Sequence, residues 1–152
     1  MSNVRPMYTI LANKIREAFE VEKLQFNELA SAETYDDEGT NDHFYSTYWQ
    51  DHNMPEIAYF TSSLTYFTPK AFCYFLPSFL LASLDEPNSG FTEVVTEHLC
   101  PPKNDTARPS FMAWWSLLTN AQRTVVIDFL KAMQLEYNLV LNLDIEKLEA
   151  VL

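Results

Sequence analysis

The segment Thr68–Leu84, which reads TPKAFCYFLPSFLLASL, decides the fold class of this chain. Thr68 is a favoured N-cap residue and Pro69 is favoured in the first helical turn, so the sequence predicts a helix over 69–84. Apolar residues occupy nearly every side of this predicted helix, which is typical of a helix buried at the centre of a domain. Pro77 lies inside it, where it removes a backbone hydrogen bond and predicts a kink.

Helical patterns continue on both sides of this central segment. Thr119 with Gln122 forms a capping box that opens the last long helix, and apolar residues then recur every three or four positions. A further capping box is predicted at Asn53 and Glu56, with Pro55 in the first turn. Helices are predicted at residues 6–24, 43–50, 53–60, 91–99, 111–118, 119–137 and 144–152, and polar loops at 31–43 and 100–109.

The predicted fold is therefore all-α, a compact single-domain helical bundle over residues 1–152 around the Pro-kinked helix. A length of 152 residues is usual for one domain, and 47% hydrophobic residues can build its core without metals or disulfides. Only residues 137–143, YNLVLNL, favour a strand.

Composition also narrows the location and chemistry of the protein. The chain has no apolar run long enough for a membrane span, and its first residues lack the pattern of a signal peptide. Cys73 and Cys100 are not arranged as CxxC, so two reduced thiols and a cytoplasmic location are expected. Glycine occurs only at Gly39 and Gly90, which excludes the glycine-rich phosphate-binding loops.

The negative charge is concentrated in one part of the chain. Of the net charge of −11, residues 24–69 carry eight carboxylates and no Lys or Arg, together with ten aromatic residues. This balance argues against direct binding of nucleic acid or of an anionic membrane, because both need basic residues. Carboxylates can steer a basic partner, and Tyr and Trp can anchor it. The alternative is a solvated acidic loop whose aromatic residues fold into the core.

The candidate partner-binding residues all come from this segment. They combine carboxylates with aromatic side chains, and they are Glu33, Tyr35, Asp36, Asp37, Glu38, Asp42, Tyr45, Tyr48, Trp49 and Asp51.

The run that begins at Leu64, LTYFTPKAFCYFLPSFL, resembles a motif in a family of small uncharacterised bacterial proteins, where it reads approximately LTFLTPEAFRYYLPAFL. The capped segment Leu118–Leu130 resembles a second motif of that family. The resemblance implies a helical fold and no particular activity, and Cys73 stands where a basic residue is frequent. In size and acidity the chain is also similar to the immunity proteins of bacterial toxin systems.

Two histidines lie close in sequence to several carboxylates. His43 and His52 are near Asp42, Asp51 and Glu56, and such groups can bind Zn or Fe or support acid–base chemistry. Their spacing matches no known ligand motif, and no HExxH is present. The sequence therefore predicts ordinary surface or interface residues here, with no catalytic residue, no metal and no cofactor.

Cys73 is a further candidate, because Lys70 stands three residues before it near a helix start and a nearby cation can activate a thiol. Its neighbours Phe72 and Tyr74 favour a thiol buried in the core instead.

These observations favour an acidic protein-binding module rather than an enzyme. The expected function is that of an immunity or antitoxin-type protein that neutralises a basic partner, such as a nuclease toxin domain. The alternatives are a nucleic-acid mimic that inhibits a DNA- or RNA-binding protein, and an enzyme that uses the His/Asp/Glu group.

Overall fold

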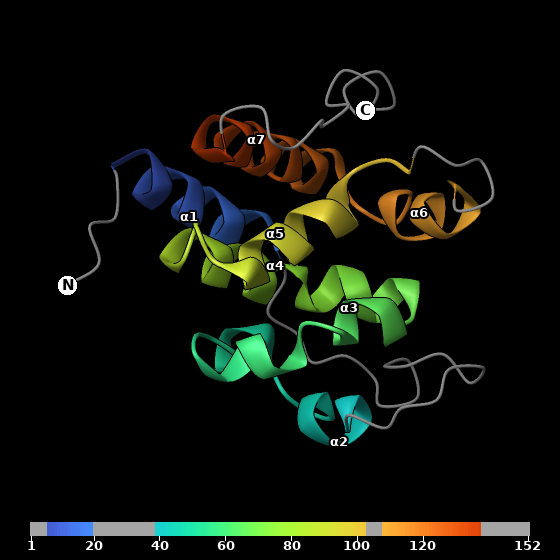
Figure 1. Ribbon diagram of the computed structural model, residues 1–152. Coiled ribbons are helices and arrows are strands. Elements are labelled where there is room, and N and C mark those ends of the chain that lie inside the picture. Colours follow the sequence, from blue (N-terminus) through green and yellow to red (C-terminus); the bar gives the residue numbers. More distant parts are fainter. Residues whose placement is uncertain (1–5, 20–38, 103–107, 138–152) are drawn as a thin grey trace.

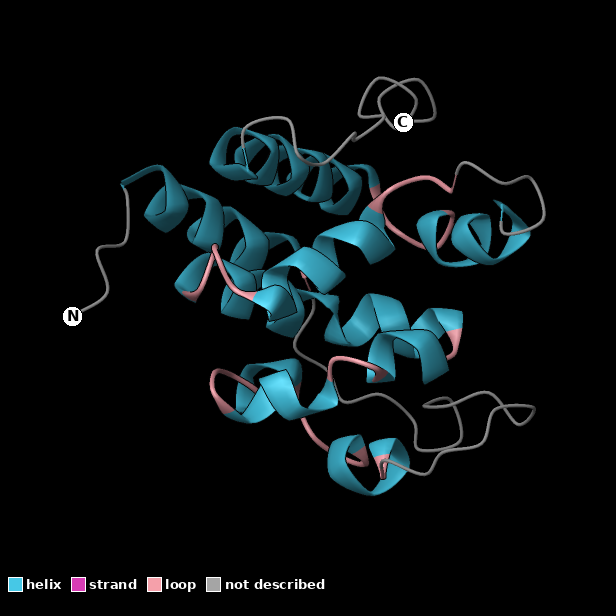
Figure 2. Cartoon of the chain, in the orientation of Figure 1, coloured by secondary structure: helices cyan, strands magenta, loops and turns pink. Residues whose placement is uncertain are grey.

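The computed structural model describes residues 6–19, 39–102 and 108–137 of the chain (Figure 1). Within these ranges the backbone forms helices joined by turns and loops, and Figure 2 shows no strand among them. The elements in chain order are α1 Pro6–Ala18, α2 Thr40–Phe44, η2 Trp49–Asp51, η3 Glu56–Phe60, α3 Ser63–Tyr66, α4 Pro69–Asp85, α5 Gly90–Leu99, α6 Arg108–Trp115 and α7 Asn120–Tyr137. The predicted all-α fold is confirmed.

Helix α4 is the centre of the structure, as its sequence predicts. The Thr68 side chain accepts a hydrogen bond from the backbone amide of Ala71 at 3.2 Å, which caps the first turn. Phe75, Leu76, Phe79 and Leu80 are fully buried along the helix. The helix packs against α1, α5, α6, η2 and η3. It continues through Pro77, whose side chain is buried.

Helices α1 and α7 lie side by side and antiparallel (Figure 1). Tyr8, near the start of α1, donates its hydroxyl proton to Glu136, near the end of α7, at 2.7 Å. At the opposite end, the Gln122 side-chain amide donates to the carbonyl of Ala18 at 3.1 Å. Gln122 also completes the predicted capping box, because its side chain accepts from the Thr119 amide while its own amide donates to the Thr119 hydroxyl.

The first predicted helix is longer than the helix in the structure. It was expected over 6–24, whereas α1 ends at Ala18, and residues 20–38 lie outside the described ranges. Likewise, the predicted helix 144–152 and most of the strand-like segment 137–143 lie outside them. No helix of the described ranges is long and apolar enough to cross a membrane.

The predicted helix 43–50 and the end of the predicted loop 31–43, at residues 40–43, are also corrected. Helix α2 already begins at Thr40, directly after Gly39, whose φ of 77° is easily adopted by glycine. The helix then ends at Phe44, because Ser46 adopts a left-handed conformation with φ 57°. A turn therefore separates α2 from the short helix η2, and this turn brings two histidines together.

Candidate functional site

Two buried aromatic residues fix α2 and η2 on the central helix. Phe44 is fully buried, and its ring centroid lies 4.8 Å from that of Phe75 on α4. Trp49 is 3% exposed, and its carbonyl accepts a hydrogen bond from the Ser78 hydroxyl of α4 at 2.5 Å. Burial of two large rings and this buried hydrogen bond hold the backbone on either side of the turn in place.

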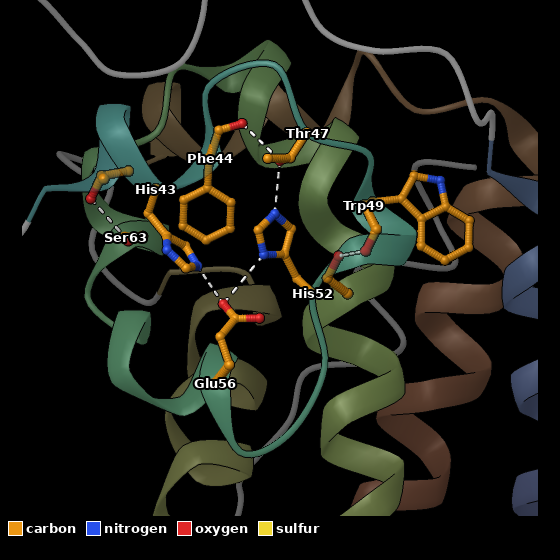
Figure 3. A network of polar contacts seen from close by, with 9 residues as sticks. His43, Phe44, Thr47, Trp49, His52, Glu56 and Ser63 are labelled. Carbon is orange, nitrogen blue, oxygen red and sulfur yellow. Dashed lines mark hydrogen bonds and ion pairs between the residues drawn. The ribbon is translucent and has the colours of Figure 1, made fainter.

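His43, His52 and Glu56 come together beside this turn, with their side chains pointing toward one another (Figure 3). His43 is on α2, His52 follows η2, and Glu56 opens η3. The Glu56 carboxylate oxygen Oε2 contacts His43 Nε2 and lies 3.3 Å from His52 Nδ1. One potential metal-ligand atom of each residue lies within 4.8 Å of the others. We call these three residues the His–His–Glu cluster.

Glu56 therefore has a different role from the one predicted for it. The sequence favours a capping box with Asn53, but η3 has Pro55 at its N-cap position and no side-chain capping hydrogen bond. Instead, the carboxylate of Glu56 contacts the two imidazoles, which lie outside η3 and take the place of a local capping partner.

Thr47 connects His52 to the backbone of the turn. The Thr47 hydroxyl forms hydrogen bonds with two groups, the carbonyl of Phe44 and His52 Nε2, each at 2.8 Å. When the hydroxyl gives its single proton to the Phe44 carbonyl, it accepts from His52 Nε2, and His52 Nδ1 then presents a lone pair to Glu56.

The surroundings of His52 favour the neutral ring. His52 is 7% exposed, and its ring lies 4.5 Å from that of Phe44 and 5.7 Å from that of Phe75, between centroids. Burial lowers the pKa of His52 below its usual value, and this effect outweighs the opposing attraction of the Glu56 carboxylate.

The other two members of the cluster lie nearer the surface. The His43 ring stacks on Phe60, with centroids 3.7 Å apart and 14° between the planes, and its side chain is 27% exposed. The Glu56 side chain is 36% exposed. The cluster thus has a buried side at His52 and a side that small solutes can reach.

The predicted partner-binding residues differ in their exposure to solvent. Tyr45 and Tyr48 are exposed, at 51% and 41%, and Asp42 and Asp51 are also exposed. Trp49 belongs to the core, so its ring does not lie on the surface as an anchor; its indole packs against the central helix instead. The remaining predicted residues lie outside the described ranges, and they are Glu33, Tyr35, Asp36, Asp37 and Glu38.

Tyr59 is a surface residue that the sequence-based selection omitted. It is 81% exposed on η3, although the same short helix buries Ile57. The sequence gives little indication that Tyr59 is exposed, because a five-residue helix is too short for periodicity to separate its buried side from its exposed side.

Both thiols have structural surroundings. Cys73 Sγ donates to the carbonyl of Trp114 at 3.1 Å, and Cys100 Sγ donates to that of Thr96 at 3.1 Å. Burial raises the pKa of each thiol to about 12. Neither thiol is suited to act as a nucleophile, since the reactive form is the thiolate.

The chain belongs to a family of unknown function, DUF6714, whose family model matches residues 7–149. The expected membership in an uncharacterised family is thereby confirmed. No curated protein and no solved structure matches the chain.

Proposed function

We propose that this protein binds a basic partner protein through the exposed carboxylates and tyrosines of residues 24–69. The observation that carries the proposal lies in the described part of this segment, where Tyr45, Tyr48 and Tyr59 are exposed between acidic residues. No Lys or Arg occurs in the segment, so its eight carboxylates are not balanced by basic residues of its own sequence.

The chemistry of these side chains suits protein recognition. Tyrosine offers a large, rigid ring with a polar tip, and it is enriched at the energetic centres of interfaces. Exposed carboxylates steer a positively charged partner and raise its association rate. An immunity or antitoxin-type protein that neutralises a basic toxin domain, such as a nuclease, is the class of function that this combination favours most.

The rigid support beneath the surface also favours binding. Tyr45 and Tyr48 flank the turn that Phe44 and Trp49 anchor on α4, so the backbone that carries them is held before a partner arrives. A preorganised surface loses less conformational entropy on association than a loop that must become ordered.

Capture of partners from the native host, followed by binding kinetics, tests this proposal. The full chain should capture a basic protein, and Tyr45→Ala, Tyr48→Ala or Tyr59→Ala should weaken its binding. Leu135→Ala, which truncates an exposed apolar residue on α7, is the matched control and should leave binding unchanged. An acidic partner, or equal effects of the tyrosine variants and the control, would contradict the proposal.

A further inference from the structure

We propose that the His–His–Glu cluster is a binding site for one divalent transition-metal ion of the zinc class. The ligands are His43 Nε2, His52 Nδ1 and the Glu56 carboxylate. This site is independent of the proposed partner binding, because it rests on different side chains and a different chemistry.

The donor set selects the kind of ion. Two imidazole nitrogens and one carboxylate oxygen suit Zn²⁺ and the neighbouring first-row metals, whereas Mg²⁺ and Ca²⁺ prefer sets made of oxygen alone. In a tetrahedral Zn²⁺ site with bonds of about 2.0 Å, ligand atoms lie about 3.3 Å apart. Glu56 Oε2 and His52 Nδ1 already have this separation, at 3.3 Å.

Thr47 contacts His52 as a neighbouring oxygen contacts a metal-binding histidine in known protein metal sites. A metal-bound histidine usually gives its second N–H to a nearby oxygen, which fixes the tautomer and the orientation of the ring. Here that oxygen is the Thr47 hydroxyl, 2.8 Å from Nε2, and the Phe44 carbonyl orients the hydroxyl in turn (Figure 3). Thr47 is thus a positioning residue, and it leaves Nδ1 as the donor atom.

The two remaining ligands can adjust to an ion. His43 and Glu56 are the more exposed members of the cluster, and their present contact is replaced when both bind the metal. Three protein ligands leave the fourth tetrahedral position to water or to another small ligand, as in zinc sites that keep an open position.

Zinc titration of the full, untagged chain tests the site after treatment with a chelator. Competition with a chromogenic zinc chelator measures affinity and stoichiometry, and we expect one Zn²⁺ per chain. His43→Gln and Glu56→Gln should bind at least about 10-fold more weakly, and Thr47→Val about 10- to 100-fold more weakly. His98→Gln is the matched control, because His98 is the only histidine outside the cluster, and its affinity should equal that of the original chain.

Imidazole NMR of the unsubstituted chain gives a test that does not depend on how any variant folds. Addition of one equivalent of Zn²⁺ should shift the ring ¹⁵N resonances of His43 and His52 and leave those of His98 unchanged. Binding of less than one Zn²⁺ per chain at about 100 µM metal would overturn the proposal and leave a hydrogen-bonded cluster only. Shifts at His98 alone, or equal zinc affinity in all variants, would overturn it as well.

Discussion

The Thr47 hydroxyl lies 2.8 Å from both His52 Nε2 and the Phe44 carbonyl and forms a hydrogen bond with each of them. The hydrogen bond to Thr47 sets the orientation of the buried His52 ring. Thr47 also closes the turn, because its backbone amide donates to the Phe44 carbonyl at 3.2 Å. The local backbone of residues 44–47 and the chemistry of His52 are thus linked through one side chain.

Thr47→Val should destabilise the protein by about 1–3 kcal/mol, because the substitution leaves the buried Nε2 of His52 without its hydrogen-bond partner. Chemical unfolding by urea measures this change. Thr124→Val is the matched control, since Thr124 is exposed on α7 and its hydroxyl donates to the carbonyl of Asn120 four residues back. The control should change stability by no more than about 0.5 kcal/mol. Equal losses in both variants would show that the Thr47–His52 hydrogen bond has no special role.

Acid should destabilise the metal-free protein partly through His52. Its pKa is lowered in the folded state, so below pH 6.5 the unfolded chain binds a proton that the folded chain resists. Stability therefore falls as the pH drops from 6.5 toward the lower folded pKa, and this contribution is absent above that window. Urea midpoints of the original chain and of His52→Gln, measured from pH 8 to pH 5, should converge as the pH falls. Parallel curves would contradict the expected titration.

The thiols should react slowly while the chain is folded. A pKa of about 12, against an ordinary value of 9.0, lowers the thiolate fraction at pH 8 by about 1000-fold. Alkylation of Cys73 and Cys100 by iodoacetamide, followed by mass spectrometry, should therefore be far slower in buffer than in concentrated urea. Rapid labelling of Cys73 under native conditions would instead indicate an activated thiol.

Patterns within one element predicted most of the fold. The helix of residues 69–84 and the Thr119–Gln122 capping box depend on neighbours a few positions apart, and both occur as expected. Glu56 was different, because the local pattern with Asn53 favours a cap while the tertiary structure supplies two histidines. The sequence around Glu56 does not show whether its side chain caps the helix or contacts the histidines, since the histidines lie outside η3.

The arrangement of the cluster depends on a turn that the sequence did not reveal. His43 and His52 are nine positions apart, a spacing that one continuous helix would place far from each other along its axis. Ser46, with its left-handed backbone conformation, ends α2, and the turn that follows lets the two histidines lie close together. Trp49 was similarly uncertain, because an aromatic residue beside carboxylates fits both a core and an interface, and only packing on α4 decides between them.

The kinetics of association with the captured partner test the central claim most directly. We predict that raising salt slows association much more than it speeds dissociation, because exposed charges act through a screening length of about 10 Å at 0.1 M salt. The triple substitution Asp36→Lys, Asp37→Lys and Glu38→Lys should lower the association rate in the same way. Its control reverses three exposed carboxylates elsewhere, Asp85, Glu86 and Glu97, and should have a smaller effect. Association that ignores salt up to about 0.5 M, where screening is nearly complete, would contradict binding of a basic partner by this segment.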